Sequence, residues 1–371
     1  MNRTRIPGEA FIACAAVLLA VLSGCAPPER VANDPLCLAV LEALPKSYGG
    51  GRSCEAVPEG VVIGSRDEAR HIVPLLTRAN AIYRRYLGGT PARVAYLIGS
   101  EMPEGARDAA KHRDAVIINW PSMRGQRETF AKAMRKEVDN NFSHAPQNVR
   151  DEMLNKMMAG FQNQISSNGV PSPFEAGTIQ HELGHLWFAS TYVSEGSQDT
   201  QELARSGNQY GTSAPDWLDE ASAIVLETDY LTNVRRKRVA DTVGSGNDEL
   251  IPSLLELTSM THPVLSVDRE LIPMHEGSNI SIGVNIRPDR KISGDARDSG
   301  WFYAMVRAFV DFLIDNSGDP LVLKSIASEL AKGASLSDWL ASSPHREDFG
   351  GSVDEMDRMW RAWLRSYREY N

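Results

Sequence analysis

The feature that most constrains this chain is a pair of histidines, His181 and His185, with Glu182 directly after the first. The surrounding residues 174–191 have helical apolar spacing, and side chains at i and i+4 of a helix lie on one face, one turn apart. The two imidazoles can therefore bind one metal ion, with Glu182 within reach of a water at that ion. Nitrogen ligands at this spacing suit tetrahedral Zn²⁺, which lowers the pKa of its water to about 7.

A catalytic zinc site needs a third protein ligand and keeps one position open for water. The segment Asp216-Trp217-Leu218-Asp219-Glu220 offers adjacent carboxylates, and neighbours on a helix point about 100° apart, so only one can face the ion. The pattern H-E-L-x-H-x-W-F from His181, together with W-L-x-E ending at Glu220, resembles the thermolysin-like gluzincin zinc metallopeptidases, nearest to the aminopeptidase N branch. The resemblance implies that Glu220 is the third ligand, with Asp219 as its nearest rival.

The same resemblance implies roles for residues around the ion. Glu182 is the implied general base and then the proton donor to the leaving amine. Tyr303 falls where the aminopeptidase N branch has a catalytic tyrosine at the start of a helix, and its phenol would donate a hydrogen bond to the oxyanion. His262 and His275 are alternatives for that donor, and a core tyrosine is the other interpretation of Tyr303.

Departures from that branch limit what is implied about the substrate. The stretch between His185 and Glu220 is longer than in aminopeptidase N, and the Gly-x-Met-Glu-Asn segment that binds a free amino terminus is absent. The Lys-Gly that usually follows the catalytic tyrosine is also missing. Aminopeptidase specificity therefore does not transfer, and the chain is more similar to the broader bacterial peptidase-MA-like proteins. Cleavage specificity, endo- or exo-cleavage and a lid role for residues 194–216 stay open.

The chain begins with the pattern of an exported lipoprotein. Two arginines precede one apolar run, residues 10–22, which is shorter than the roughly 20 residues that a membrane-spanning helix needs. The run ends in Leu22-Ser23-Gly24-Cys25, which resembles a bacterial lipobox, so residues 1–24 are predicted to be a signal peptide and Cys25 the lipidated terminus. Ala26 resembles outer-membrane sorting, which predicts a periplasm-facing lipid anchor. Ordinary secretory cleavage is the alternative.

Of the four cysteines, Cys14 lies in the predicted leader and Cys25 carries the predicted lipid, so Cys37 and Cys54 remain. In an oxidising compartment such a pair is expected to form a disulfide, and two free thiols are the alternative. Because residues 26–60 are rich in proline and contain a glycine triplet, we predict a lipidated tether with a disulfide loop over residues 25–60. The packed body is then expected to begin near Val61.

Residues 61–371 are predicted to form one zinc metallopeptidase domain, with a front lobe to about residue 190 and a helical lobe after it. Val- and Ile-rich runs are typical of strands in a small mixed sheet, whereas longer runs with one apolar face are typical of helices. The expected strands cover residues 93–98 and 115–120, and the expected helices after them cover 174–191, 217–231 and 301–316. Residues 124–165 are expected to form polar helices. Strands in front and helices behind predict an α+β fold, and the resemblance implies its thermolysin-like form.

Acidic and basic residues after Glu220 have no assigned role in the sequence. Glu227 and Asp229 are candidates for a carboxylate behind the zinc histidines, and their spacing favours neither. The cluster Arg235-Arg236-Lys237-Arg238 is predicted to be a solvated helix end, with contact to anionic lipid as the alternative.

Net charge excludes one class of partner. A formal net charge of -9 over 371 residues provides no basic stripe that could displace the counterions of a nucleic acid. We therefore predict a lipid-anchored zinc metallopeptidase that hydrolyses a peptide or protein of the bacterial cell envelope. Two alternatives stay open: a non-catalytic binding or assembly lipoprotein with a relic or structural zinc site, and a zinc hydrolase of a non-peptide amide or epoxide. The oligomeric state is not predicted.

Overall fold

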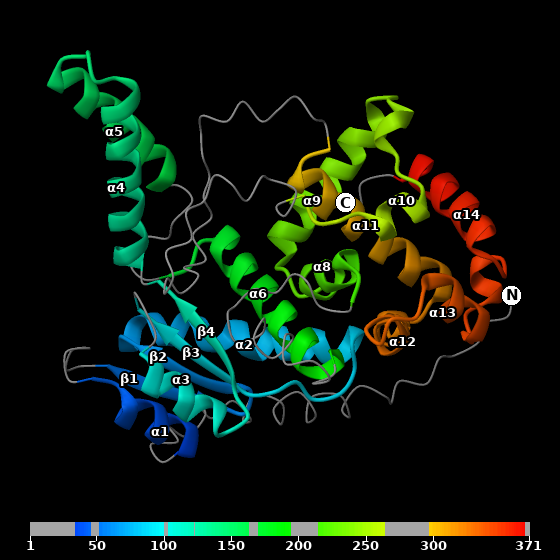
Figure 1. Cartoon of the computed structure of the whole chain (residues 1–371), viewed down its shortest axis with the longest axis horizontal. Helices are drawn as coiled ribbons and strands as arrows, with labels where there is room; N and C mark the ends of the chain where they lie inside the picture. The colour runs from blue at the N-terminus through cyan, green and yellow to red at the C-terminus, as the bar shows by residue number, and fades with distance from the viewer. Residues whose placement is uncertain are drawn as a thin grey trace, which may run out of the picture.

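The computed structural model describes residues 34–45, 52–99, 103–121, 123–162, 170–193, 214–263 and 297–367. It is an α+β fold with a small mixed sheet at one end followed by a helical region (Figure 1). Among the described helices, none combines the length and the apolar character needed to span a membrane. The predicted signal peptide, Cys25, His275 and most of the 194–216 segment lie outside the described residues.

The sheet has four strands in the order β1-β2-β3-β4. They are β1 (Ser53–Val57), β2 (Gly60–Gly64), β3 (Val94–Ile98) and β4 (Val116–Trp120). β1 and β2 form an antiparallel hairpin, and β2, β3 and β4 are parallel. Parallel neighbours need long crossovers, and α2 (Arg66–Tyr86) and α3 (Glu104–Lys111) supply them. The strands predicted at 93–98 and 115–120 are confirmed, and among the described residues β1 and β4 form the two edges of the sheet.

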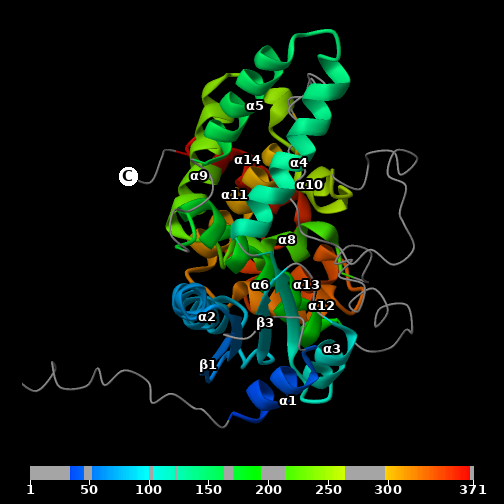
Figure 2. The same cartoon turned by 90° about the vertical axis from the view of Figure 1, so that its left-hand side faces the viewer.

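The central strands serve two cores because successive side chains point to opposite faces. In β3, Val94, Tyr96 and Ile98 join the main core with α2, while Ala95 and Leu97 join a second core with α1 (Pro35–Ala43) and α3. Figure 2 shows α1 and α3 on one side of the sheet and α2 on the other.

The packed body begins earlier than predicted, at Asp34 and not near Val61. The Asp34 side chain caps α1, and Leu36, Cys37 and Val40 of that helix are buried against the sheet. A disulfide joins Cys37 on α1 to Cys54 on β1, which confirms that pairing. The prolines and glycines of this stretch suggested a tether, but the second face of the sheet needs an apolar cover, and α1 provides part of it.

The helical region surrounds one long buried helix. Its elements are α6 (Pro173–Tyr192), α8 (Asp216–Ile224), α9 (Asp229–Gly244), α10 (Leu254–Ser259), α11 (Ser299–Ser317), α12 (Val322–Leu330), α13 (Leu336–Ser342) and α14 (Val353–Arg365), with 3-10 turns at Asp248–Leu250 and Glu347–Phe349. α11 is buried along most of its length and packs against α8, α9, α12 and α14. The helices predicted at 174–191 and 301–316 are confirmed.

The single helix expected over 217–231 is two helices. α8 ends at Ile224 and α9 begins at Asp229, and the turn between them buries Glu227. The apolar pattern runs through the break because Val225 and Leu226 are also buried, which hides the turn from periodicity.

The basic cluster lies inside α9 and is not a solvated helix end. Arg235 contacts Glu227, Arg236 contacts Asp311, and Arg238 contacts Asp298. Lys237 is exposed and pairs with Asp241 on its own helix. Residues in succession on a helix point in different directions, so three of the four cations face acids of the packed body.

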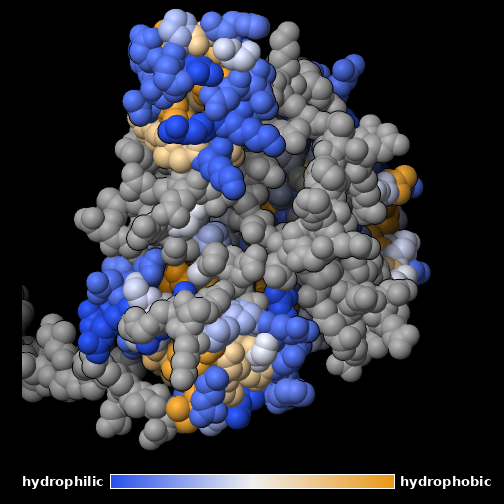
Figure 3. Space-filling model, turned by 60° about the vertical axis from the view of Figure 1, so that its left-hand side comes forward, coloured by the Kyte–Doolittle hydropathy of each residue, from blue (hydrophilic) through white to orange (hydrophobic). Residues whose placement is uncertain are grey.

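A helical hairpin projects from this body. It consists of α4 (Met123–Asn141) and α5 (Gln147–Gln162), which pack against each other and stand clear of the sheet (Figures 1 and 2). Hydrophilic residues cover most of the hairpin surface in Figure 3. The polar helices predicted over 124–165 are thus confirmed.

Candidate metal centre

Helix α6 carries both motif histidines and is fixed at its start by side-chain caps. The hydroxyl of Ser172 accepts from the backbone N–H of Glu175, and Pro173 stands at the first helical position, where its missing N–H costs nothing. The Glu175 carboxylate in turn accepts from Trp120 Nε1 at 3.0 Å, which ties the first turn of α6 to the edge strand β4. α6 also packs against α2, α8 and α9, so its orientation is set on several sides (Figure 1).

His181, His185 and Glu220 meet in one buried cluster. The Nε2 atoms of the two histidines are 3.1 Å apart, and the Glu220 carboxylate lies 3.4 Å from His181 Nε2 and 3.8 Å from His185 Nε2. One ligand atom from each residue falls within 4.8 Å of the others, so the three side chains could hold a metal ion together. Glu182, the next residue of α6, is half-buried.

A glycine inside the motif lets α8 come close enough to deliver Glu220. A Cβ placed on Gly184 would lie 2.4 Å from the Cα of Ala223 and 2.7 Å from the backbone oxygen of Ser222. Real Cβ atoms do not approach backbone this closely, so a larger residue would push the two helices apart. A Cβ on Gly177 would meet side chains instead, with Leu231 Cδ1 of α9 at 2.5 Å and Thr228 Oγ1 at 2.9 Å.

Two further carboxylates face the outer nitrogens of the histidines. Glu227 Oε1 lies 3.0 Å from His181 Nδ1, and Asp219 Oδ1 lies 3.0 Å from His185 Nδ1. Asp219, the rival third ligand, therefore faces the back of a histidine and is not one of the three convergent residues. Of the two candidates left open after Glu220, Glu227 is the one that contacts a histidine, while Asp229 is exposed and pairs with Arg78.

The contacts of Glu227 and Asp219 behind the histidines indicate whether the cluster suits a metal ion. An ionised carboxylate only accepts hydrogen bonds, so a carboxylate at Nδ1 favours the tautomer with the proton on Nδ1 and a lone pair on Nε2. Two such lone pairs would then face each other at 3.1 Å, beside the Glu220 carboxylate. That arrangement is repulsive unless positive charge lies among the three groups. The donor set therefore fits a cation.

The pKa values of the cluster reflect the negative charge of the carboxylates around the histidines. Burial lowers the pKa of His181, but Glu220 and Glu227 outweigh it and raise that pKa to about 10. Burial raises the pKa of Glu220, but the histidines around it outweigh that effect and hold the pKa at about 2. The surroundings of both groups thus stabilise positive charge on the histidines and negative charge on the carboxylate.

Tyr303 and His262 both lie at this cluster, although the sequence left them as alternatives. His262 Nε2 is 3.2 Å from the Tyr303 hydroxyl and 3.3 Å from Glu220 Oε1, and the Tyr303 and His181 rings are 5.8 Å apart. The backbone N–H of His262 donates to Asp216 at the start of α8, which fixes this segment. Burial lowers the pKa of His262 and so favours its neutral form.

The sequence predicted only part of the role of two residues at this centre, Arg235 and His262. Arg235 contacts both Glu227 and the ring of Tyr303, although it was assigned only to a basic cluster. His262 was identified as an alternative donor, whereas its contact with Glu220 follows from the way α8, α10 and α11 pack. No local pattern signals either contact, because both span more than one helix.

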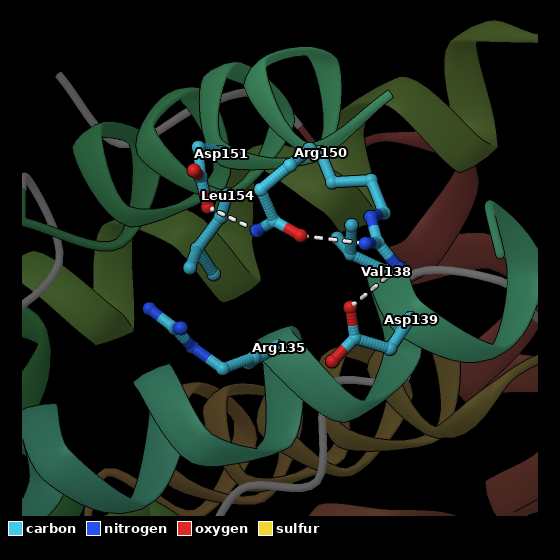
Figure 4. A pocket seen from close by; sticks show the side chains of 7 residues that line it. Arg135, Val138, Asp139, Arg150, Asp151 and Leu154 are labelled. Atoms are coloured by element: carbon cyan, nitrogen blue, oxygen red, sulfur yellow. Dashed lines mark hydrogen bonds and ion pairs between the residues drawn. The ribbon is translucent and has the colours of Figure 1, made fainter. Parts of the chain in front are cut away.

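A separate cavity lies in the α4–α5 hairpin. Its volume is about 270 Å³, and it is lined by polar and apolar side chains from both helices: Arg135, Val138, Asp139, Gln147, Arg150, Asp151 and Leu154 (Figure 4). Arg150 pairs there with Asp139 at 3.3 Å. The cavity shares no residue with the metal centre.

Comparison of the chain with protein-family models, with curated proteins and with solved structures gives no match. The site itself is a buried group of two histidines and a glutamate that could hold a metal ion. Such a group is consistent with a metal-dependent hydrolase.

Proposed function

We propose that this chain is a zinc-dependent metallopeptidase of the thermolysin-like type. The observation that carries the proposal is the convergence of His181, His185 and Glu220 on one point, with a carboxylate behind each histidine. Two nitrogens and one carboxylate oxygen make up the donor set of catalytic zinc, and a fourth position would stay open for water and substrate. When bound there, Zn²⁺ supplies Lewis acidity for the attacking water and the scissile carbonyl.

Glu182 is the proposed general base. It follows His181 on α6 and is half-buried. In the proposed reaction, one of its carboxylate oxygens takes a proton from the attacking water. The same oxygen then returns that proton to the nitrogen of the leaving amine. One carboxylate can serve both steps. Proton uptake from the water leaves it protonated for the transfer to the amine, and that transfer restores the carboxylate.

Tyr303 is the proposed oxyanion donor, and His262 determines the direction of its hydrogen. The Glu220 carboxylate only accepts and lies 3.3 Å from His262 Nε2, so we assign the ring hydrogen of His262 to this nitrogen. The same nitrogen faces the Tyr303 oxygen, which therefore accepts there and keeps its own O–H for the substrate. One such donor commonly contributes about 3 kcal/mol to transition-state stabilisation.

Several features support a peptide of the cell envelope as the substrate. Because Trp120 and Glu175 connect β4 to α6, an extended peptide added to that sheet edge would run beside the metal helix. The lipobox ending at Cys25 supports export and a lipid anchor facing the periplasm. The disulfide between Cys37 and Cys54 is of a kind that persists in oxidising compartments.

The test compares the purified mature chain with its Glu182→Gln variant, a change that keeps the size and polarity of the side chain but removes the base. We expect one zinc per chain in both proteins. Only the wild type is expected to cleave a mixture of synthetic peptides, with the variant slower by about 10²-fold or more. Product masses would show which bonds are cut.

Other outcomes would contradict the proposal in distinct ways. Zinc binding without cleavage of any peptide would favour the binding or assembly lipoprotein. Cleavage only of a non-peptide amide or an epoxide would favour the other hydrolase. Full activity of the Glu182→Gln variant would remove the base assignment.

A further inference from the structure

Arg235 stands directly behind the metal centre. Its guanidinium contacts both oxygens of the buried Glu227 carboxylate, with NH2 at 2.9 Å from Oε1 and Nε at 3.4 Å from Oε2. Glu227 Oε1 is also the atom that faces His181 Nδ1 at 3.0 Å. One carboxylate oxygen is thus shared between the guanidinium and the imidazole, so a movement of Arg235 would move the partner of His181.

The same guanidinium makes a second contact on another helix. Its central carbon lies 4.6 Å from the centre of the Tyr303 ring, within the range of a cation–π interaction. Tyr303 belongs to α11, whereas Arg235 belongs to α9, and those helices pack closely. Arg235 therefore contacts the proposed oxyanion donor and, through Glu227, a proposed metal ligand.

These contacts close into a ring around the metal centre. In order, the ring passes through His181, Glu227, Arg235, Tyr303, His262 and Glu220, with the remaining contact between Glu220 and His181. The six residues come from α6, the turn after α8, α9, α11, the segment after α10 and α8. A ring of this kind couples the position of each member to that of its neighbours.

We propose that Arg235 is a positioning residue. Through Glu227 it sets the orientation of the His181 ring, and by its own contact it holds the Tyr303 phenol in place. The inference rests on the proposed function for the role of the phenol, but its effect on metal binding does not require any peptidase activity. A buried carboxylate needs a cation or several hydrogen bonds, and removal of its partner is costly. Arginine suits the position because a planar guanidinium can bind a carboxylate by two nitrogens and also stack on a ring, which lysine cannot do.

The test measures zinc affinity in the mature chain by competition with a chelator. Arg235→Met keeps the length and apolar character of the side chain but removes the guanidinium. Lys237→Met is the matched control, since it removes the same charge from an exposed site two residues along α9. We expect Arg235→Met to weaken zinc binding by about 10- to 100-fold and the control to leave it unchanged. Arg235→Lys is expected to fall between them.

A double variant separates positioning from a general loss of stability. If Arg235 acts on the metal through Glu227, the variant Glu227→Gln/Arg235→Met should bind zinc no more weakly than the weaker of the two single variants. The absorption spectrum of bound Co²⁺ should also change in Arg235→Met, because the His181 ring is reoriented. Circular dichroism would confirm that each variant is folded, and Arg235→Lys serves if Arg235→Met is not.

The outcomes distinguish this inference from the proposed function. If the wild type binds zinc, and Arg235→Met and Arg235→Lys bind it as tightly with an unchanged Co²⁺ spectrum, the inference is wrong while the peptidase proposal stands. Independent, additive losses from Glu227→Gln and Arg235→Met would also overturn it. A wild type that takes up no zinc overturns both. Weakened zinc binding in Arg235→Met, without peptide cleavage by the wild type, supports the inference alone.

Discussion

The Nε2 atoms of His181 and His185 lie 3.1 Å apart, while the Nδ1 atom of each ring faces a different carboxylate. A carboxylate behind each ring favours the tautomer with its hydrogen on Nδ1, which leaves the lone pairs on the two facing Nε2 atoms. Glu220 then approaches from α8 and adds a negative charge at that place. The two histidines and Glu220 thus form a group that could hold a metal ion, and zinc is the ion of our proposal.

Adjacent acids on α8 should affect metal binding by different amounts. Glu220→Gln removes a charged ligand, so we expect zinc affinity to fall by more than about 100-fold, or to be lost. Asp219→Asn removes only the contact behind His185, and outer partners of this kind typically contribute about 10- to 100-fold. Chelator competition on both variants measures the difference. A larger loss for Asp219→Asn would make Asp219 the ligand.

Gly184→Ala should separate α6 from α8. The added methyl would lie 2.4 Å from the Cα of Ala223, so we expect a loss of about 1–3 kcal/mol in the free energy of unfolding, and weaker zinc binding. Gly244→Ala at the end of α9 is the matched control, because nothing lies within 4 Å of its added carbon. That variant should be as stable as the wild type or more stable by up to about 1 kcal/mol. Urea unfolding checks both, and equal stabilities would contradict the close helix contact.

Acid should weaken one ion-pair network of the helical region. Burial raises the pKa of Asp311, but Arg307 and Arg236 outweigh it and hold that pKa below its ordinary value of 3.8. The unfolded chain therefore takes up this proton first as the pH falls. The stabilisation is complete above the ordinary carboxyl range and is lost as the pH falls through the lowered pKa of the folded state.

The Asp311→Asn variant measures this effect. Its unfolding free energy should be lower than that of the wild type by about 3–5 kcal/mol near pH 7, because buried Arg307 loses its partner. The difference should be constant from about pH 7 to 5 and shrink below the ordinary carboxyl range. Asp108→Asn, at an exposed position of α3, is the control and should change stability by less than about 0.5 kcal/mol. A difference that grew on acidification would have the wrong sign for this network.

Loss of the disulfide should destabilise the front of the molecule. Cys37 and Cys54 are separated by 17 residues, and a cross-link of that loop length contributes about 3 kcal/mol. The double variant Cys37→Ser/Cys54→Ser should unfold at correspondingly lower urea concentration. A reducing agent should produce a similar shift in the wild type and none in the variant. Equal stability of oxidised and reduced wild type would mean that the bond contributes nothing.

Local patterns predicted most elements of the fold. Val- and Ile-rich runs located β3 and β4, and helical apolar spacing located α6, because such patterns indicate surfaces that must be buried. The polar stretch over 124–165 located α4 and α5. α1 was missed, although Asp34 before Pro35 is a helix-start signal, because prolines and glycines on both sides outweighed it. The break after Ile224 was missed because the buried residues continue across it.

The sequence by itself determined that His181 and His185 share a helix face with Glu182 beside them, because that geometry follows from the period of the helix. A resemblance was needed to select Glu220 over Asp219. Only the tertiary structure decided that Glu227 and not Asp229 faces His181, that His262 and Tyr303 lie together, and that Arg235 links two helices. Those contacts join residues from separate elements, and their distances depend on how closely the helices pack, as the glycine at position 184 illustrates.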